Sequence, residues 1–257
     1  MTTADPGPGG RTLRIPGTFN VRDLGGFPVH GGAVVRRGVL VRSAELSALE
    51  PAGAAILAGL GLRTVVDLRT HDEVGARPDQ LSGTGAELRS VPLLSLPYDE
   101  IPAAQIDLYD YMADFCAKET AQAVRALAAP GALPALFHCA VGKDRTGFLA
   151  AVILALIGVP DEEIVRDFLL SNPALGLPKQ EHTGSARPTR DGSEDEDAES
   201  VDHPLLLASR NAISADLITE VLGRIRGRHG TIAAYLLAGG VTEPELESLT
   251  AALVDHD

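Results

Sequence analysis

The sequence predicts an α/β fold, with a central and mostly parallel sheet flanked by helices. The first observation is a short apolar run, Leu133–Phe137, which is typical of a buried strand. The second is a longer apolar run, Phe148–Val159, which is typical of a helix buried on nearly all sides. The third is the loop between them, which carries one cysteine, two glycines and two cations. This order is expected at the centre of such a sheet, with the loop between the central strand and the buried helix.

Further strands and helices are expected on both sides of this centre, in a sheet of four or five strands. Short apolar segments predict strands at Ala33–Val41, Arg63–Leu68 and Leu88–Leu94. Proline at helix starts and apolar spacings of three and four residues predict helices at Pro51–Leu60, Ile101–Ala129, Pro160–Ser171, Ile213–Arg228, Thr231–Leu237 and Pro244–Val254.

A single domain is expected to span residues 13–257. With 257 residues and 45% hydrophobic side chains, the chain can bury an ample core. Residues 1–12 are rich in proline and glycine and are predicted to form a disordered tail. Residues 172–204 are rich in proline, glycine, serine and charge, and seven acidic residues lie between Asp191 and Asp202. This composition predicts an acidic, disordered insertion.

The composition also excludes several classes of protein. Two cysteines are too few for a disulfide framework and fit a reducing compartment, so a cytoplasmic location is predicted. The chain has no run of eighteen apolar residues that would predict a membrane span, and its N-terminus lacks a basic-then-apolar signal pattern. Secretion by a route without a signal peptide stays open. The net charge of −13 argues against a general nucleic-acid surface.

The segment His138–Gly147 carries the residues from which a chemistry can be inferred. Cys139 and Arg145 are separated by five residues, in a loop that precedes a helix. Backbone N–H groups at a helix start point inward and, together with the helix dipole, bind a dianion such as phosphate. In this setting a thiol is expected to ionise, with its pKa lowered from about 8.5 to about 3.5–7.5, and to act as a nucleophile. Arg145 offers a planar fork for two phosphate oxygens.

The other loop residues are expected to support phosphate chemistry. Thr146 can donate its hydroxyl to the sulfur, and His138 can orient the loop and favour the thiolate through hydrogen bonds. A small buried cysteine at a strand end is the alternative, but it does not account for the order of strand, cysteine, arginine, glycine and helix. An ATP-binding loop is excluded because no serine or threonine follows Gly142-Lys143. The predicted substrate-binding residues are Ala140, Val141, Gly142, Lys143, Thr146 and Gly147.

These residues resemble the loop His-Cys-x-x-Gly-Lys-Asp-Arg-Thr-Gly of a bacterial tyrosine-protein phosphatase family, which comprises atypical tyrosine and phosphoinositide phosphatases. The resemblance covers roughly residues 11–170 and 212–255. It implies the cysteine-phosphatase fold and hydrolysis of phosphotyrosine through a cysteinyl-phosphate intermediate, with phosphoserine and phosphothreonine as further candidate substrates. Phosphoinositide lipids are the alternative substrates. Further matching segments are 19–26 (FNVRDLGG), 42–47 (RSAELS), 66–69 (VDLR) and 230–237.

Two aspartates are candidates for the general acid. Tyrosine phosphatases of other families carry this acid on a Trp-Pro-Asp loop, but this chain has no tryptophan. Asp144 can act as the acid if the bound dianion raises its pKa, and the family resemblance implies the same role. Asp99, on a loop after a predicted strand, is the other candidate, and a solvated turn is an equal interpretation for it. Lys143 either points outward or contributes charge for a second phosphate.

Polar residues outside the loop are interpreted as structural or supporting. The residues Asn20, Arg22 and Asp23 are expected to form a hydrogen-bonded buttress. The functional alternative places Asn20 or Arg22 beside the phosphate loop as support. A solvated, ion-paired turn is expected for Arg69, Asp72, Glu73 and Arg77.

The predicted reaction needs no metal or cofactor, because the loop amides and Arg145 neutralise the phosphate. Its expected partner is a phosphorylated protein or a phosphoinositide. Two other classes remain open, a phosphate-binding module without catalysis and a sulfur-transfer enzyme of the rhodanese type. The intact Cys139, Asp144 and Arg145 argue against the first class, and the Lys-Asp-Arg-Thr-Gly run argues against the second.

Overall fold

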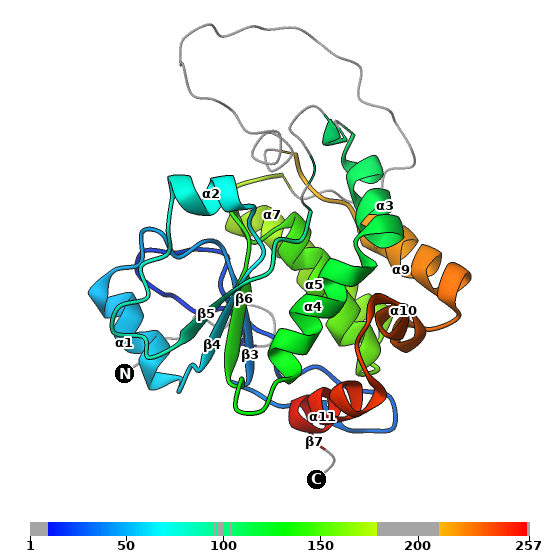
Figure 1. Cartoon of the computed structure of the whole chain (residues 1–257), viewed down its shortest axis with the longest axis horizontal. Coiled ribbons are helices and arrows are strands. Elements are labelled where there is room, and N and C mark those ends of the chain that lie inside the picture. The colour runs from blue at the N-terminus through cyan, green and yellow to red at the C-terminus, as the bar shows by residue number, and fades with distance from the viewer. Residues whose placement is uncertain (1–9, 95, 97–99, 103, 179–210, 256–257) are drawn as a thin grey trace, which may run out of the picture.

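The structure is a computed structural model that describes residues 10–94, 96, 100–102, 104–178 and 211–255. At its centre lies a five-stranded sheet in the order β1–β3–β6–β4–β5 (Figure 1). Strands β3, β6, β4 and β5 are parallel, and β1 pairs antiparallel with β3 at the edge. This confirms the predicted α/β class with a mostly parallel sheet. A separate ribbon pairs β2 with β7. The strands are β1 (Arg22–Asp23), β2 (Val34–Val35), β3 (Leu40–Ser43), β4 (Thr64–Asp67), β5 (Glu87–Ser90), β6 (Ala135–His138) and β7 (Val254–Asp255).

Helices lie on both faces of the sheet, as predicted. Helix α5 is central, and every residue from Asp144 to Leu154 is buried, as its apolar run predicts. The helices are α1 (Pro51–Gly59), α2 (His71–Ala76), α3 (Gln105–Phe115), α4 (Ala117–Ala128), α5 (Asp144–Leu156), α6 (Asp161–Leu169), α7 (Ser171–Ala174), α9 (Ala215–His229), α10 (Ile232–Gly239) and α11 (Glu243–Leu253).

Successive side chains of the central strands enter two different cores. Val65 and Leu136 belong to a cluster that includes Leu57 of α1. Val66 and Phe137, the next residues along the same strands, belong to a larger cluster on the opposite face. This alternation follows from the pleat of a strand, which points neighbouring residues to opposite faces. Figure 1 shows α1 on one side of the sheet and α4 and α5 on the other, so the loop before α5 is fixed between packed layers.

Two predicted elements are divided in the structure. The segment Ala33–Val41 forms β2 and the start of β3, because the chain turns at Gly38, whose φ of 72° is left-handed. The helix predicted for Ile101–Ala129 breaks at Cys116, whose ψ of 25° departs from helical geometry, so α3 and α4 are separate helices.

The prediction of a disordered tail over residues 1–12 is wrong for the last residues of this segment. Residues 1–9 lie outside the described residues. Arg11 places its guanidinium 3.9 Å from the centroid of the Phe27 ring, and Thr12 forms a bridge to β1. A cation–π contact and a backbone pairing therefore order the chain from Arg11 onward, which composition does not reveal.

The prediction of a disordered insertion over residues 172–204 is wrong for the first residues of this segment. Asn172 is buried next to α7, donates to the Ile213 carbonyl (2.8 Å) and accepts from the Ile213 N–H (2.9 Å). These bonds tie the two sides of the insertion together. Residues 179–210, which include the acidic run, lie outside the described residues.

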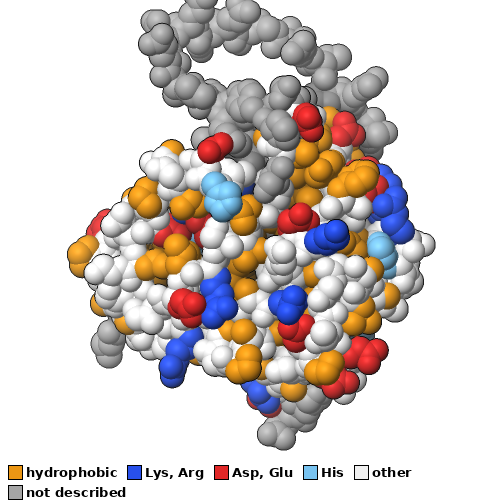
Figure 2. All heavy atoms as spheres, viewed as in Figure 1, with side chains coloured by type: hydrophobic (Ala, Val, Ile, Leu, Met, Phe, Trp, Pro, Cys, Tyr) orange, Lys and Arg blue, Asp and Glu red, His pale blue; other side chains and the backbone are white. Residues whose placement is uncertain are grey.

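In the part of the chain that the structure describes, none of the helices is long and apolar enough to cross a membrane. Figure 2 shows cationic and anionic side chains interspersed over one face of the molecule, with hydrophobic and uncharged ones between them. Exposed ion pairs include Arg125 with Glu245 (3.0 Å) and Arg89 with Glu87 (3.0 Å). Such exposed pairs contribute little to stability, about 0–1 kcal/mol each.

Candidate active site

The loop 138–147 lies at the carboxyl ends of the parallel strands. The last residues of β3, β6 and β4, which are Ser43, His138 and Asp67, are neighbours in the sheet register. The segments that follow these strands therefore converge on Cys139, the residue after β6. Cys139 is 2% exposed, and α5 begins nearby at Asp144. The predicted position of the cysteine, between the central strand and the buried helix, is confirmed.

The carbonyl oxygens of four consecutive loop residues, 139 to 142, all accept hydrogen bonds from groups outside the loop or at its edge. One of the donors is Nδ1 of the His138 ring. Because a carbonyl oxygen can only accept a hydrogen bond, this ring carries a proton on Nδ1. The bonds are His138 Nδ1 to Cys139 O (3.1 Å), Glu45 N to Ala140 O (3.1 Å), Asn20 Nδ2 to Val141 O (3.1 Å) and to Gly142 O (2.9 Å), and Arg42 Nη2 to Gly142 O (2.7 Å).

Holding these carbonyls outward turns the N–H groups of residues 140–143 inward, because the C=O and N–H of a trans peptide unit point in opposite directions. Gly142 has a left-handed φ of 68°, and a Cβ there would lie 2.4 Å from the Ser43 carbonyl oxygen. Only glycine fits this position. The loop therefore offers a ring of N–H donors beside the N-terminus of α5, which is suited to an oxyanion.

Arg145 is fixed by a bidentate pair with Glu73. Its Nη1 and Nη2 each lie 2.7 Å from one Glu73 carboxylate oxygen, and Nη1 also lies 3.4 Å from the Leu68 carbonyl oxygen. Burial opposes the charge on Arg145, but the Glu73 hydrogen bonds and the nearby Cys139 outweigh it and raise the pKa of Arg145. A guanidinium has five N–H donors, so this pairing leaves donors for a phosphate.

Glu73 itself is held in place by a capping box at the start of α2. It accepts from the Thr70 N–H (2.8 Å), while the Thr70 side chain accepts from the Glu73 N–H (3.3 Å). The prediction that Glu73 belongs to a solvated turn is therefore wrong. The spacing Thr-x-x-Glu was visible in the sequence and is the signal that could have located this helix start.

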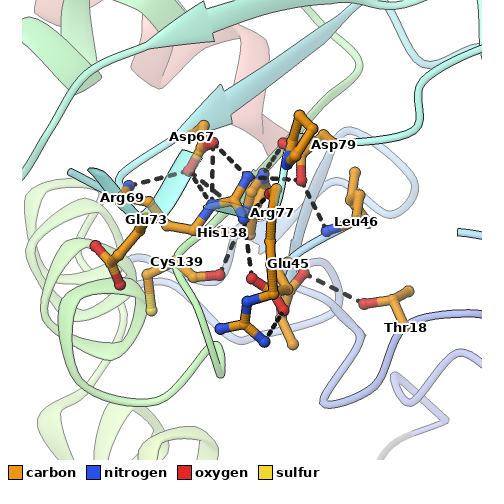
Figure 3. A network of polar contacts seen from close by, with 12 residues as sticks. Thr18, Glu45, Leu46, Asp67, Arg69, Glu73, Arg77, Asp79, His138 and Cys139 are labelled. Carbon is orange, nitrogen blue, oxygen red and sulfur yellow. Dashed lines mark hydrogen bonds and ion pairs between the residues drawn. The ribbon is translucent and has the colours of Figure 1, made fainter. Parts of the chain in front are cut away.

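The prediction of a solvated turn is also wrong for Arg69, which is fully buried. Its guanidinium contacts Asp67 (2.8 Å), Asp79 (2.8 Å) and Glu45 (2.9 Å) (Figure 3). The three carboxylates compensate the Arg69 guanidinium for the hydration that it loses on burial. The sequence does not reveal that these carboxylates gather around Arg69. Arg77, half-exposed, follows the prediction better and pairs with Glu45 at 2.7 Å.

This network of Asp67, Arg69 and Asp79 reaches the loop through His138. The His138 Nε2 lies 3.0 Å from an Asp79 carboxylate oxygen, and Nδ1 donates to the Cys139 carbonyl. Burial lowers the pKa of His138, but Asp79 and Asp67 outweigh burial and raise it. Figure 3 shows the Cys139 sulfur pointing away from the network, on the side of Glu73. His138 thus contacts the loop backbone and not the sulfur directly, and its predicted effect on the thiolate stays a prediction.

Asp144, the first residue of α5, receives two hydrogen bonds from α3. Its Oδ1 accepts from the Tyr109 hydroxyl (3.0 Å) and from Gln105 Nε2 (3.1 Å). Its Oδ2 lies 3.7 Å from the ammonium of Lys143. Asp144 is 7% exposed and comes directly after residues 140–143, whose N–H groups face the oxyanion site. The alternative candidate for the acid, Asp99, lies outside the described residues.

Lys143 does not point outward into solvent. Its ammonium donates to the Asn211 carbonyl at 2.5 Å, and its side chain is fully buried. Burial lowers the pKa of Lys143 against the opposing effect of Asp144. The predicted second-phosphate role would require this ammonium to leave the Asn211 carbonyl.

The segment 19–26 supports the loop through a buried ion cluster. Asn20 lies against the loop, as the functional alternative proposed. Arg22 is one step removed, because it pairs with Asp167 (3.1 Å) and donates to the Asn20 side-chain oxygen. Asp167 also pairs with Arg42 (2.9 Å). Asp23 forms the expected buttress and accepts from the N–H groups of Gly25 (2.8 Å) and Gly38 (2.9 Å).

The chain matches the model of the tyrosine phosphatase family over residues 13–255. It belongs to this family. It is 29% identical over 228 residues to a tyrosine-protein phosphatase of Nostoc commune, covering 83% of this chain and 73% of that protein. It is 31% identical over 196 residues to the triple specificity protein phosphatase PtpB of Mycobacterium tuberculosis, covering 63% of this chain and 69% of that protein.

Solved structures with related chains include the TpbA protein of P. aeruginosa, at 23% identity and a TM-score of 0.35 over 53% of this chain and 71% of that chain. Membership of the tyrosine phosphatase family agrees with the cysteine-phosphatase fold that the loop predicts. It also makes the protein a hydrolase of phosphoric monoesters.

Several residues of this tyrosine phosphatase that touch the loop were not found from the sequence. One of them is Tyr109, whose hydroxyl contact with Asp144 depends on where α3 packs. Thr146, which was predicted to assist the sulfur, has a buried hydroxyl without a hydrogen-bond partner in the described residues, so it is available for one. The other missed residues are Arg42, Glu45, Asp79 and Gln105, together with Asp167, which pairs with Arg42 and does not touch the loop itself.

The two cysteines of this tyrosine phosphatase differ in surroundings. Both are unpaired and buried, but Cys116 lies between α3 and α4, where burial and Glu119 raise its pKa to about 12. We expect iodoacetamide at neutral pH to modify Cys139 and not Cys116, and inorganic phosphate to slow the modification. Peptide mass spectrometry of the native protein tests this. Label on Cys116, or a labelled Cys139→Ser variant, would contradict the assignment.

Proposed function

We propose that this protein is a cysteine-dependent phosphatase that hydrolyses phosphotyrosine through a cysteinyl-phosphate intermediate. The observation that carries the proposal is the loop backbone. Four consecutive carbonyls are held outward, so their peptide N–H groups face one oxyanion site with Cys139 at its base. Arg145, aimed by Glu73, adds charge-assisted donors to the same site.

The first step forms the intermediate. The Cys139 thiolate attacks phosphorus in line, so that a sulfur–phosphorus bond forms and the phosphorus–oxygen bond to the tyrosine breaks. Asp144 gives its proton to the leaving phenolic oxygen. The loop N–H groups and Arg145 stabilise the charge on the three equatorial oxygens in the transition state.

The second step regenerates the enzyme. Asp144, now ionised, takes a proton from a water molecule whose oxygen attacks phosphorus. The sulfur–phosphorus bond breaks, and the electron pair returns to Cys139. The buried Thr146 hydroxyl is a donor for the departing thiolate. Inorganic phosphate then leaves the loop.

The burial of Lys143 favours phosphotyrosine over phosphoinositides as the substrate. A second phosphate on an inositol ring would need this ammonium, but it is buried and bonded to the Asn211 carbonyl. A cytoplasmic location stays a prediction that is based on the low cysteine count of the sequence.

The first test compares phosphate release from a phosphotyrosine peptide and from short-chain phosphoinositides, in the presence of EDTA. We expect faster release from the peptide and full activity in EDTA, because loop amides and Arg145 supply the charge that a metal would otherwise provide. A requirement for added divalent ions would contradict the mechanism. Faster release from phosphoinositides would overturn the substrate assignment while leaving the mechanism intact.

A further inference from the structure

The two oxygens of the Asp144 carboxylate have different surroundings. Oδ1 accepts two hydrogen bonds, from the Tyr109 hydroxyl (3.0 Å) and from Gln105 Nε2 (3.1 Å). Both donors come from the first two turns of α3. Oδ2 lies 3.7 Å from Lys143 Nζ, and Lys143 is itself held by the Asn211 carbonyl. The carboxylate therefore has one oxygen that accepts two hydrogen bonds and one oxygen that is ion-paired with Lys143.

Tyr109 is built as a permanent donor. It is fully buried, and its ring meets Phe168 of α6 edge-to-face at 5.8 Å, which fixes the hydroxyl direction. Burial and the adjacent Asp144 raise the pKa of Tyr109 well above its usual value, so the phenol is protonated at neutral pH. Its hydroxyl donates to Asp144 Oδ1, and Gln105 Nε2, which can only donate, is directed at the same oxygen.

We propose that Tyr109 and Gln105 are positioning residues for the general acid, and that they confine its transferable proton to Oδ2. The inference rests on the proposed function. In a protonated carboxyl one oxygen carries the proton and the other only accepts. Two donors aimed at Oδ1 make Oδ1 the accepting oxygen, so the proton resides on Oδ2. The same two bonds fix the rotation of the carboxyl, which determines where Oδ2 meets the leaving oxygen.

This role has a signature that a merely structural role lacks. The phenol of tyrosine, with a pKa of about 10, is a poor leaving group unless it receives a proton as the bond breaks. The far more acidic 2,4-dinitrophenol leaves as an anion and needs no proton. Loss of acid positioning should therefore slow phosphotyrosine hydrolysis selectively, whereas damage to the phosphate loop should slow both substrates.

The experiment measures kcat/KM for phosphotyrosine and for 2,4-dinitrophenyl phosphate in a series of variants, because this ratio reports formation of the cysteinyl-phosphate and not its hydrolysis, in which Asp144 acts as base for both substrates. Asp144→Asn calibrates complete loss of the acid, for which we expect about 10²- to 10⁴-fold lower kcat/KM on phosphotyrosine and little change on the dinitrophenyl ester. For Tyr109→Phe we expect about a 10-fold selective loss, because Gln105 still holds Oδ1. Gln105→Met, at the half-buried start of α3, should give a smaller selective loss and provides a second test if Tyr109→Phe folds poorly.

The matched control is Tyr235→Phe, which removes another buried tyrosine hydroxyl. That hydroxyl lies 3.3 Å from the Thr120 hydroxyl and 3.5 Å from the Met112 carbonyl, away from the loop. It should leave the ratio of the two rates unchanged. Adding Tyr109→Phe to Asp144→Asn should produce no further selective loss, since the group to be positioned is absent.

The outcomes separate this inference from the function on which it rests. If Asp144→Asn slows both substrates equally, the acid assignment in the proposed function fails. If Asp144→Asn is selective but both Tyr109→Phe and Gln105→Met change the two rates equally or not at all, the positioning role is wrong and the acid assignment stands.

Discussion

Replacing Cys139 with serine is expected to lower kcat for phosphotyrosine hydrolysis by about 10⁴- to 10⁶-fold, as when one member of the catalytic triad of a covalent serine hydrolase is removed. A serine hydroxyl is protonated at neutral pH and needs a base to become a nucleophile. His138 cannot serve, because its Nδ1 donates to the Cys139 carbonyl and its Nε2 faces Asp79 at 3.0 Å. The substitution therefore leaves the loop without an attacking group.

The same variant should keep its affinity for inorganic phosphate. The loop carbonyls are anchored by Asn20, Arg42, Glu45 and His138, and none of these bonds involves the sulfur. The oxyanion site is thus expected to persist without the nucleophile. Isothermal titration with phosphate measures this directly and suits a chain that has no tryptophan.

Cys116→Ser is the matched control, because it makes the same change at a buried cysteine between α3 and α4. It should retain activity on phosphotyrosine. If Cys139→Ser turned over phosphotyrosine at a rate near that of the wild type, the covalent mechanism would be wrong. If it lost both turnover and phosphate binding, Cys139 would have a structural role in the loop, and the nucleophile assignment would need a trapped cysteinyl-phosphate.

The sequence identified the loop because its parts are contiguous. Strand, Cys139, Arg145 and helix follow one another within a short segment, so local pattern alone orders them in space. Gly142 was also identifiable, although its close approach to the Ser43 carbonyl required the structure. The central position of β6 followed from its apolar run and from the loop after it.

The partners of the loop were not predictable, since they come from distant parts of the chain. Tyr109 is 35 residues from Asp144, Glu73 is 72 residues from Arg145, and Asp167 is 125 residues from Arg42. Which side chains meet across such separations depends on helix packing and strand order. Arg69 shows the same limit in energetic terms: a charge is normally solvated, and only the folded arrangement of Asp67, Asp79 and Glu45 makes its burial tolerable.

The largest effect on stability is expected at Asp167, one of the residues that the sequence did not reveal. It is 1% exposed and pairs with two buried arginines, Arg22 at 3.1 Å and Arg42 at 2.9 Å. Burial disfavours the charge on Asp167, but the two arginines outweigh burial, so the pKa of Asp167 is lowered. Removing this carboxylate would leave two guanidinium groups buried without their common partner.

We therefore expect Asp167→Asn to lower the free energy of unfolding by about 3–5 kcal/mol at neutral pH, as when one partner of a buried ion pair is removed. Because the folded-state pKa of Asp167 lies below its unfolded value of about 3.9, the ionised cluster stabilises the fold above that pH. The contribution is lost as the pH falls below it. Urea unfolding over a pH series measures the loss of free energy at neutral pH and its dependence on pH. The difference in free energy of unfolding between wild type and variant should narrow below about pH 4.

Asp161→Asn is the control for this prediction, because it breaks an exposed pair with Arg226 (2.6 Å) whose side chains are 44% and 38% exposed. It should change the free energy of unfolding by at most about 1 kcal/mol. Equal losses of the free energy of unfolding in both variants would show that the buried Asp167 cluster stabilises the fold no more than an exposed ion pair does.

The Asp167 cluster also links stability to the active site through Arg42, whose Nη2 donates to the Gly142 carbonyl at 2.7 Å. A triple variant that replaces Arg22, Arg42 and Asp167 with apolar residues of similar size removes every unpaired charge, so it should recover much of the lost stability. It should not recover full activity, because the Gly142 carbonyl loses its Arg42 donor and the loop N–H groups lose part of their alignment. Recovery of both properties together would mean that Asn20, which also donates to that carbonyl, is sufficient to hold the loop.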